Sequence, residues 1–276
     1  MIQFTVDEQR CTRCGQCAHD CPAGIIEQEG EALPCIRPDQ EEECIQCQHC
    51  LAVCPSGAVS VLGRKPVDSL PLSHDSFPRF EDMARFVRGR RSVRQYRNQN
   101  VDPALIKQLL ATLANAPTGV NRHELTFRVI DDKVVMQRLR DKVYAGFAVA
   151  NAARRVPERF SYLEDLVKES MDHQKDIILR GAPHALVVSA PPDAPCPNQD
   201  VTLALAYFEL LAQSAGLGTV WCGLLWMVLE TLPELKADFG LPVDHIHYAM
   251  LFGYPAVRYA RTVQRDAAAQ VYRVAL

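Results

Sequence analysis

The chain has 276 residues and a mass of 30.8 kDa, enough for one large domain with a small one or for two modest domains. Hydrophobic residues make up 48% of the sequence and charged residues 23%, which excludes a disordered or fibrous protein. The net charge of −3 is divided unequally: residues 1–60 hold ten acidic and three basic residues, a balance of −7, which leaves +4 for the rest. This asymmetry argues against a general nucleic-acid binder and indicates two parts with different roles.

The sequence gives no sign of export or of membrane insertion. Residues 1–8 lack the basic and apolar segments of a signal peptide. The uncharged stretch 210–229 is long enough to span a bilayer, but Gly216, Gly218 and Gly223 interrupt it. We therefore expect a buried helix, a tight turn and a second helix there, and a cytoplasmic protein that binds neither membrane nor nucleic acid.

Nine of the eleven cysteines lie before residue 55, and eight of these form an internal repeat. Each copy has the spacing C-x2-C-x2-C-x3-C-P, and each cysteine of the second copy follows its counterpart by 33 residues (44 minus 11). Without export, such a cluster is more typical of metal binding than of disulfides. The two runs are Cys11, Cys14, Cys17 and Cys21, then Cys44, Cys47, Cys50 and Cys54.

Residues 1–62 resemble two-cluster bacterial ferredoxins, in which three cysteines of one run and the fourth of the other hold each [4Fe-4S] cluster. The resemblance implies Cys11, Cys14, Cys17 and Cys54 as ligands of one cluster. It implies Cys44, Cys47, Cys50 and Cys21 as ligands of the other. Structural zinc is the alternative, but zinc sites usually pair two ligands on each side of a long gap. Cys35 lies outside both runs, and we expect it to bind no metal.

Residues 63–80 are rich in Pro and Ser and predict a linker, which leaves 81–276 as a second domain. Asp102 and Pro103 predict the start of a helix that ends before Pro117. Alternating helices and strands predict an α/β or α+β domain. The expected strands are 125–130, 184–190 and 245–252, and the expected helices are 80–88, 103–116, 133–143, 160–179 and 200–215.

Three segments of this second domain indicate chemistry. The run Arg90-Arg91-Ser92-Val93-Arg94 suits bidentate binding of a phosphate or a ring carbonyl, although a solvated or nucleic-acid-binding face is an equal alternative. Residues 116–123 form a Pro/Gly turn, for which a plain loop is the alternative. Residues 216–223 are rich in glycine but are not G-x-G-x-x-G, and nothing predicts a Rossmann domain.

Taken in order, these segments resemble the nitroreductase family of FMN enzymes over residues 82–266. The motifs are R-x-S-x-R with a following aromatic residue, A-P-[ST]-x-x-N, G-L-G-[TS]-x-W, and G-Y-P followed by arginines. They are matched by Arg90, Ser92, Arg94 and Tyr96; by Ala116, Pro117, Thr118 and Asn121; by Gly216 to Trp221; and by Gly253, Tyr254, Pro255, Arg258, Arg261 and Arg265. The family's common N-x-Q-P is absent, since Arg122, His123 and Glu124 follow Asn121.

The resemblance implies an α+β fold, a mixed five-stranded sheet wrapped in helices, and a homodimer with FMN at its interface. Arg90, Arg91, Ser92 and Arg94 are expected to contact the phosphate, ribityl chain and pyrimidine edge of the flavin. Asn121 is expected to hydrogen-bond the flavin from the partner subunit. The remaining expected FMN residues are Cys222 and Gly223 beside the ring, and Arg261 and Arg265 at the phosphate.

Two further side chains have competing interpretations. His123 is a candidate proton donor to a reduced product, since imidazole titrates near neutral pH, and a loop histidine in contact with backbone is the favoured alternative. Cys222 is a candidate redox thiol, and a small buried apolar residue is the favoured alternative.

The combination predicts an FMN-dependent oxidoreductase that receives electrons through two [4Fe-4S] clusters. Its donor would be a reduced ferredoxin or NAD(P)H, and its acceptor a small planar molecule such as a nitroaromatic or quinone. The alternative is an electron-transfer protein that passes electrons to a partner protein and has no small substrate, with the acidic N-terminal part docking to a basic surface. Reductive dehalogenation and flavin fragmentation also occur on this fold.

Overall fold

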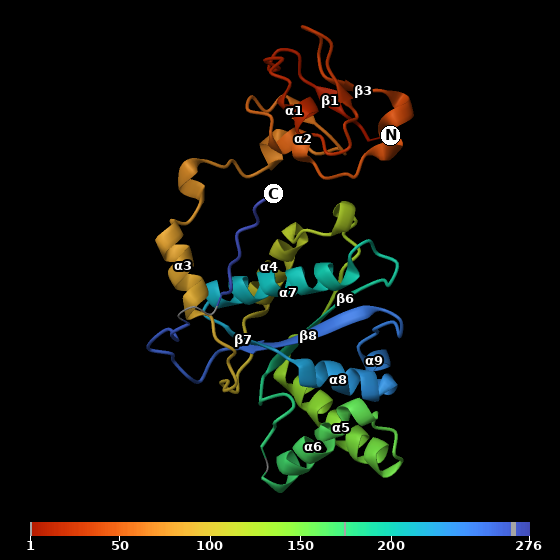
Figure 1. Cartoon of the computed structure of the whole chain (residues 1–276), viewed down its shortest axis with the longest axis vertical. Coiled ribbons are helices and arrows are strands. Elements are labelled where there is room, and N and C mark those ends of the chain that lie inside the picture. The colour runs from red at the N-terminus through yellow and green to blue at the C-terminus, as the bar shows by residue number, and fades with distance from the viewer. Residues whose placement is uncertain (1, 174, 266–268) are drawn as a thin grey trace. The chain divides into compact units, whose positions relative to one another are not determined.

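The computed structural model describes residues 2–173, 175–265 and 269–276 and divides the chain into two compact units (Figure 1). The first unit consists of residues 1–78 with the short segment 120–122, and the second contains residues 79–119 and 123–276. None of the helices in the described part of the chain combines the length and the hydropathy that crossing a membrane requires.

The first unit consists of two similar halves, each with a cysteine-bearing loop that leads into a one-turn helix. Its strands pair antiparallel as two short ribbons, β1 with β4 and β2 with β3. Cys17, Ile25, Ile26 and Val59 form its small buried core. The elements are β1 (Thr5–Val6), α1 (Gln16–His19), β2 (Ile26–Glu27), β3 (Cys35–Ile36), the 3₁₀ helix η1 (Pro38–Glu43), α2 (His49–Ala52) and β4 (Val59–Ser60).

The second unit is built around a four-stranded sheet of order β5-β6-β8-β7 (Figure 1). The two central strands read as nearly continuous apolar runs because helices cover both faces of the sheet, and every residue of β6 is buried. The strands are β5 (Thr126–Ile130), β6 (His184–Ala190), β7 (Gly218–Trp221) and β8 (Ile246–Gly253).

Alternate residues of β6 enter two different cores, as the period of a strand requires. Ala185 and Val187 pack with residues of α5, α6 and α8, whereas Leu186 and Val188 pack with residues of α4 and α7. These two groups of helices lie on opposite sides of the sheet (Figure 1). The longer helices are α3 (Phe80–Gly89), α4 (Pro103–Thr112), α5 (Lys133–Ala152), α6 (Tyr162–Asp172), α7 (Pro197–Ser214), α8 (Gly223–Thr231) and α9 (Pro233–Asp238).

The expected start of the helix at residue 103 is confirmed. The Asp102 carboxylate accepts a hydrogen bond from the Ala104 N–H at 2.9 Å, and Pro103 occupies the first turn. The α-helix ends at Thr112 and continues as the 3₁₀ turn η4 (Leu113–Asn115) before Pro117. The helix α5 extends nine residues beyond the expected end at 143, to Ala152.

Two expectations about the sheet were wrong. In the described residues the sheet has four strands rather than five, and all of its strand pairs are antiparallel rather than mixed. Within the described residues, parallel pairing at this sheet is limited to one bridge between Ser92 and Thr219. The strand β7 also lies where a tight turn and a helix were expected.

The Val93 segment packs so closely on β7 that residue 218 must be glycine. A Cβ at position 218 would lie 2.6 Å from the Val93 side chain. We expect Gly218→Ala to lower the free energy of unfolding by about 1–3 kcal/mol, as overpacking of a tight core does. Chemical denaturation measures this change. The double variant with Val93→Ala should lose less than the sum of the two single variants, and strict additivity would contradict the clash.

Candidate functional site

The two cysteine-bearing loops of the first unit share an unusual backbone conformation at equivalent positions. Arg13 and Gln46 have φ of 56° and 57°, and Gly15 and Gln48, which precede the one-turn helices, have φ of 70° and 60°. Left-handed residues are uncommon outside glycine, and each pair is separated by the 33-residue repeat. The repeat in the sequence therefore specifies the same tightly curved loop twice.

Four cysteines of the first unit line one cavity of about 280 Å³, hereafter cavity A. Three of them come from the first run and one from the end of the second run. Polar side chains of Thr12, Gln16 and Ser56 also line this cavity. The four cysteines are Cys11, Cys14, Cys17 and Cys54, the set expected to hold one cluster.

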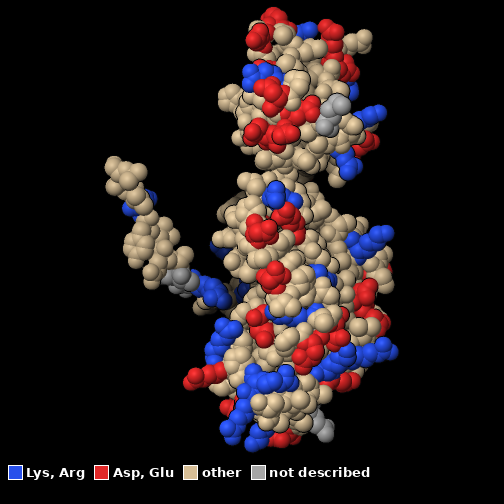
Figure 2. Space-filling model, turned by 90° about the vertical axis from the view of Figure 1, so that its right-hand side faces the viewer, with Lys and Arg blue, Asp and Glu red and all other residues tan. Residues whose placement is uncertain are grey.

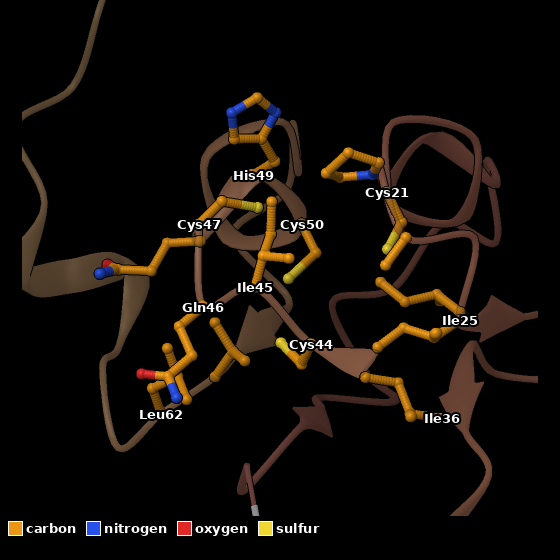
Figure 3. A pocket seen from close by; sticks show the side chains of 15 residues that line it. Cys21, Ile25, Ile36, Cys44, Ile45, Gln46, Cys47, His49, Cys50 and Leu62 are labelled. Carbon is orange, nitrogen blue, oxygen red and sulfur yellow. The ribbon is translucent and has the colours of Figure 1, made fainter. Parts of the chain in front are cut away.

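The other four cysteines line a second cavity of about 400 Å³, hereafter cavity B. They are Cys21, Cys44, Cys47 and Cys50, and Figure 3 shows their side chains around one space, with Ile25 and Ile36 beside them. The exposed Cys35 lies in β3 and lines neither cavity. The structure thus groups the eight cysteines into the two sets that were predicted as ligands.

The thiols of the two cavities differ in their surroundings. Burial raises the pKa of the Cys50 thiol to about 11 and also raises the pKa of Cys17. Burial acts in the same direction on Cys54, but hydrogen bonds outweigh it and lower the pKa of this thiol. The Ala58 N–H donates to Cys54 Sγ at 3.2 Å, and the Ser56 hydroxyl lies 3.7 Å from it. Among these three cysteines, Cys54 is therefore the one whose thiolate form is stabilised by neighbouring hydrogen-bond donors.

The surface of the first unit carries the acidic excess of residues 1–60. Figure 2 shows groups of Asp and Glu side chains on the face of this unit that is turned to the viewer. Glu8 lies 3.7 Å from Arg13, and Glu27 and Asp39 lie 3.5 and 3.7 Å from Arg37. The Asp20 carboxylate lies 3.2 Å from His49 Nδ1. Because residues 1–60 hold three basic residues against ten acidic ones, this segment keeps a net charge of −7.

In the second unit, arginines gather around an open cavity of about 1080 Å³, hereafter the arginine cavity. Arg88, Arg90 and Arg91 reach it from the end of α3, and Arg265 reaches it from the C-terminal segment. A second groove shares Arg91 and is also lined by Arg97 and Arg258. Segments that lie 174 residues apart in the sequence (265 minus 91) thus contribute guanidinium groups to one cavity.

A buried carboxylate, which the sequence analysis missed, holds one of these arginines. The side chain of Glu209 on α7 is 8% exposed, and its Oε1 lies 3.1 Å from Arg90 Nη1. Trp221 Nε1 donates to Glu209 Oε2 at 3.1 Å, and the Thr219 hydroxyl donates to Oε1 at 3.3 Å. Glu209 therefore joins α7, β7 and the arginine segment. The sequence does contain a signal for this role, because Glu209 is the only charged residue between Asp200 and Glu230.

Three other expected flavin residues are placed differently from Arg90. Arg94 Nη1 donates to the carbonyl of Ser92 at 3.3 Å, so these two residues contact each other. Arg261 is exposed and lines neither the arginine cavity nor the second groove. Of the arginines expected to meet the cofactor, the structure brings together Arg90, Arg91 and Arg265.

Cys222 is buried rather than available as a redox thiol. It caps α8, where its Sγ accepts from the Leu225 N–H at 3.4 Å and donates to the Ile178 carbonyl at 3.5 Å. Burial raises its pKa to about 11, so the thiol stays protonated at neutral pH. Gly223 opens α8, and a Cβ there would lie 3.1 Å from the Tyr248 hydroxyl.

Asn121 and His123 lie in an irregular loop after α4. Asn121 ends the 3₁₀ turn Gly119–Asn121 with φ of 59°, and His123 has φ of 52°. The backbone N–H of His123 donates to the Thr118 hydroxyl at 3.0 Å, while its side chain is exposed. His123 is thus a loop residue whose backbone is held by the Thr118 side chain.

The donor sets of these sites fit the two kinds of cofactor. Four thiols around one cavity are the ligand set of an iron–sulfur cluster. The arginine cavity presents several guanidinium groups, which bind a phosphate dianion bidentately. These residues could hold iron–sulfur clusters in the first unit and a phosphate group in the second.

Models of known families match both parts of the chain. The nitroreductase family matches residues 87–254, and a 4Fe-4S dicluster domain matches residues 10–59. Iodotyrosine deiodinase 1 of Pongo abelii is 29% identical over 208 residues, which cover 69% of either chain. A putative NADH dehydrogenase/NAD(P)H nitroreductase of Methanothermobacter thermautotrophicus is 23% identical and covers 63% of this chain and 78% of its own.

Solved structures share the fold of the second unit. A nitroreductase with bound FMN from Bacteroides fragilis aligns with a TM-score of 0.55 at 20% identity, covering 69% of this chain and 99% of its own. An FMN-dependent nitroreductase of Mycobacterium smegmatis, in complex with NADPH, aligns with a TM-score of 0.51 at 17% identity, covering 70% and 99%. The expected fold is confirmed: the chain belongs to the nitroreductase family and has a 4Fe-4S ferredoxin-like domain at its N-terminus.

Proposed function

We propose that the protein is an FMN-dependent oxidoreductase that receives electrons from a low-potential donor through two [4Fe-4S] clusters and reduces a small planar acceptor. The observation that carries this proposal is that one chain contains two cavities lined by four cysteines each and one lined by arginines. Clusters carry single electrons, and FMN accepts them singly and delivers them in pairs. A reduced ferredoxin is the favoured donor, and NAD(P)H is the other candidate.

The residues of the second unit have distinct roles in this proposal. Arg91 and Arg265 bind the phosphate, and Arg90, held by Glu209, orients toward the same cavity. Ser92, Arg94, Asn121, Gly223 and Arg261 complete the flavin site in a homodimer that holds one FMN at each interface site. His123 is a proton donor to product only if the loop brings its ring to the acceptor.

The relatives favour a second acceptor class. Both curated iodotyrosine deiodinases, at 28% and 29% identity, are named for removing iodine from an aromatic ring. A halogenated aromatic would take up two electrons and a proton and release a halide ion, whereas a nitroaromatic takes up two electrons and two protons and releases water. Both reactions use two electrons from the same donor, so they are distinguished by testing which class of acceptor the protein reduces.

The proposal is tested by anaerobic reduction of the full-length protein, followed separately at flavin and cluster absorption bands. We expect reduced ferredoxin to reduce the clusters and the flavin, after which a nitroaromatic, a quinone or a halogenated phenol reoxidises both with stoichiometric product. Arg265→Ala should lose most of its FMN and its turnover but keep its iron, while Arg138→Ala on α5 serves as an exposed arginine control.

Two results would contradict the proposal. Reduction of the flavin with no turnover of any acceptor class would support a carrier that serves a partner protein. Purification with zinc, or with free thiols, in place of iron and sulfide would remove the electron path.

A further inference from the structure

The two cysteine-lined cavities are related by the repeat but differ at one matched position. Ser56 and Ala23 both follow their Cys-Pro pair directly and are separated by the 33-residue offset. Both are half-buried, Ser56 lines cavity A, and Ala23 lines cavity B. The backbone after them is also matched, since Gly24 and Gly57 have φ of 66° and 60°. The pair therefore differs mainly by one hydroxyl.

The hydroxyl faces a cluster ligand. Ser56 Oγ lies 3.7 Å from Cys54 Sγ, within hydrogen-bond distance for sulfur, and the Ala58 N–H donates to the same sulfur at 3.2 Å. Since a metal-bound thiolate carries no proton, the hydroxyl is the donor. Ala23 offers no such group to Cys21.

The remaining lining is mixed in both cavities. Cavity B is lined by the polar residues Gln46, Gln48 and His49 as well as by the aliphatic residues Ile25, Ile26, Ile36, Ile45, Val61 and Leu62, so the difference that bears on a ligand sulfur is the Ser56 hydroxyl. Thr12, Gln16 and Ser56 line cavity A together with Pro34 and Val59. A cluster gains one negative charge when it accepts an electron, and hydrogen bonds to its sulfurs favour this charge whereas an apolar wall opposes it.

We propose that the Ser56 hydroxyl makes the cluster of cavity A easier to reduce than the cluster of cavity B, so that the first electron from the donor resides at the Cys54 side. This inference rests on the proposed function, because it requires both clusters. The inference assigns a direction to electron transfer between the two clusters: the cluster of cavity B gives up its electron more readily, and the cluster of cavity A accepts it.

The test is a potentiometric titration of the anaerobic full-length protein, with both clusters followed by electron paramagnetic resonance. In Ser56→Ala we expect one cluster to shift to lower potential, its reduction constant falling by roughly fivefold, the factor for one hydrogen bond of ordinary net strength. Ser56→Thr keeps the hydroxyl and should keep the potential. Ala23→Ser should raise the potential of the other cluster, and the double exchange of Ser56→Ala with Ala23→Ser should narrow or reverse the gap.

Each outcome distinguishes this inference from the proposed function. Two clusters whose potentials do not move in Ser56→Ala, or move equally in Ser56→Thr, would overturn the inference alone. Iron and sulfide for only one cluster in the unaltered protein would overturn the inference and the proposed function together. If Ser56→Ala loses iron, Ala23→Ser still decides the question, because it adds a donor without removing one.

Discussion

Cys17→Ala is expected to remove one iron–sulfur cluster and to destabilise the whole first unit. Cys17 is the most deeply buried cysteine of cavity A, and it is also one of the four residues of the small buried core. A unit whose hydrophobic core cluster contains four buried residues is marginally stable, so the free energy of metal binding also contributes to folding. The iron content should fall by about half or more, and limited proteolysis should cut the first unit rapidly.

Cys35→Ala is the matched control for this prediction. Cys35 is an exposed thiol of the same unit, in β3, and lines neither cavity. We expect its removal to leave iron content and proteolytic resistance unchanged. Equal loss of iron in both variants would mean that the cysteine sets are wrong, and unchanged iron in Cys17→Ala would remove it from the ligand set.

The two sets of cysteines could be predicted from the sequence because cluster binding requires a fixed spacing between ligands. Three thiols that grip one cluster must lie on one short loop, and the repeat preserves that loop. The left-handed conformation of Arg13 and Gln46 could not be predicted in this way, since neither residue type prefers positive φ. The ligands could thus be predicted, but the backbone strain that presents them could not.

The errors in the second unit have a common physical origin. β7 spans only Gly218–Trp221 and lies in an uncharged stretch whose apolar run fits a strand or a helix equally well. The segment forms a strand because it pairs with β8, and β8 lies too far along the sequence for a local pattern to reveal this pairing. By contrast, β6 was predicted with correct bounds because Pro183 and Pro191 flank its apolar run on either side.

Residues that act through partners were the hardest to predict. Arg90, Arg91 and Arg265 could be named from motifs, but the pairing of Arg90 with Glu209 depends on how α7 lies against the arginine segment. No motif includes Glu209, which sits between apolar residues of α7. A single charge within a long uncharged stretch is the one available signal, because such a residue is rarely buried without a partner.

Glu209→Ala is expected to destabilise the second unit by about 2–4 kcal/mol, because it removes one partner of a largely buried ion pair and three hydrogen bonds. Arg90 Nη1, Trp221 Nε1 and the Thr219 hydroxyl would each lose their carboxylate partner. Since the Arg90 side chain is 32% exposed, water can solvate it in part, which keeps the cost below that of a fully buried pair. Chemical denaturation followed by tryptophan fluorescence measures the loss.

Two further variants separate this network from a general effect of removing a glutamate. Glu169→Ala, at an exposed position of α6, should change stability by no more than about 0.5 kcal/mol. The double variant with Arg90→Ala should lose less than the sum of the single variants, since each single variant leaves the other partner unpaired. Additive losses would show that Glu209 and Arg90 do not interact, and FMN retention in Glu209→Ala equal to that of the unaltered protein would show that Arg90 needs no positioning.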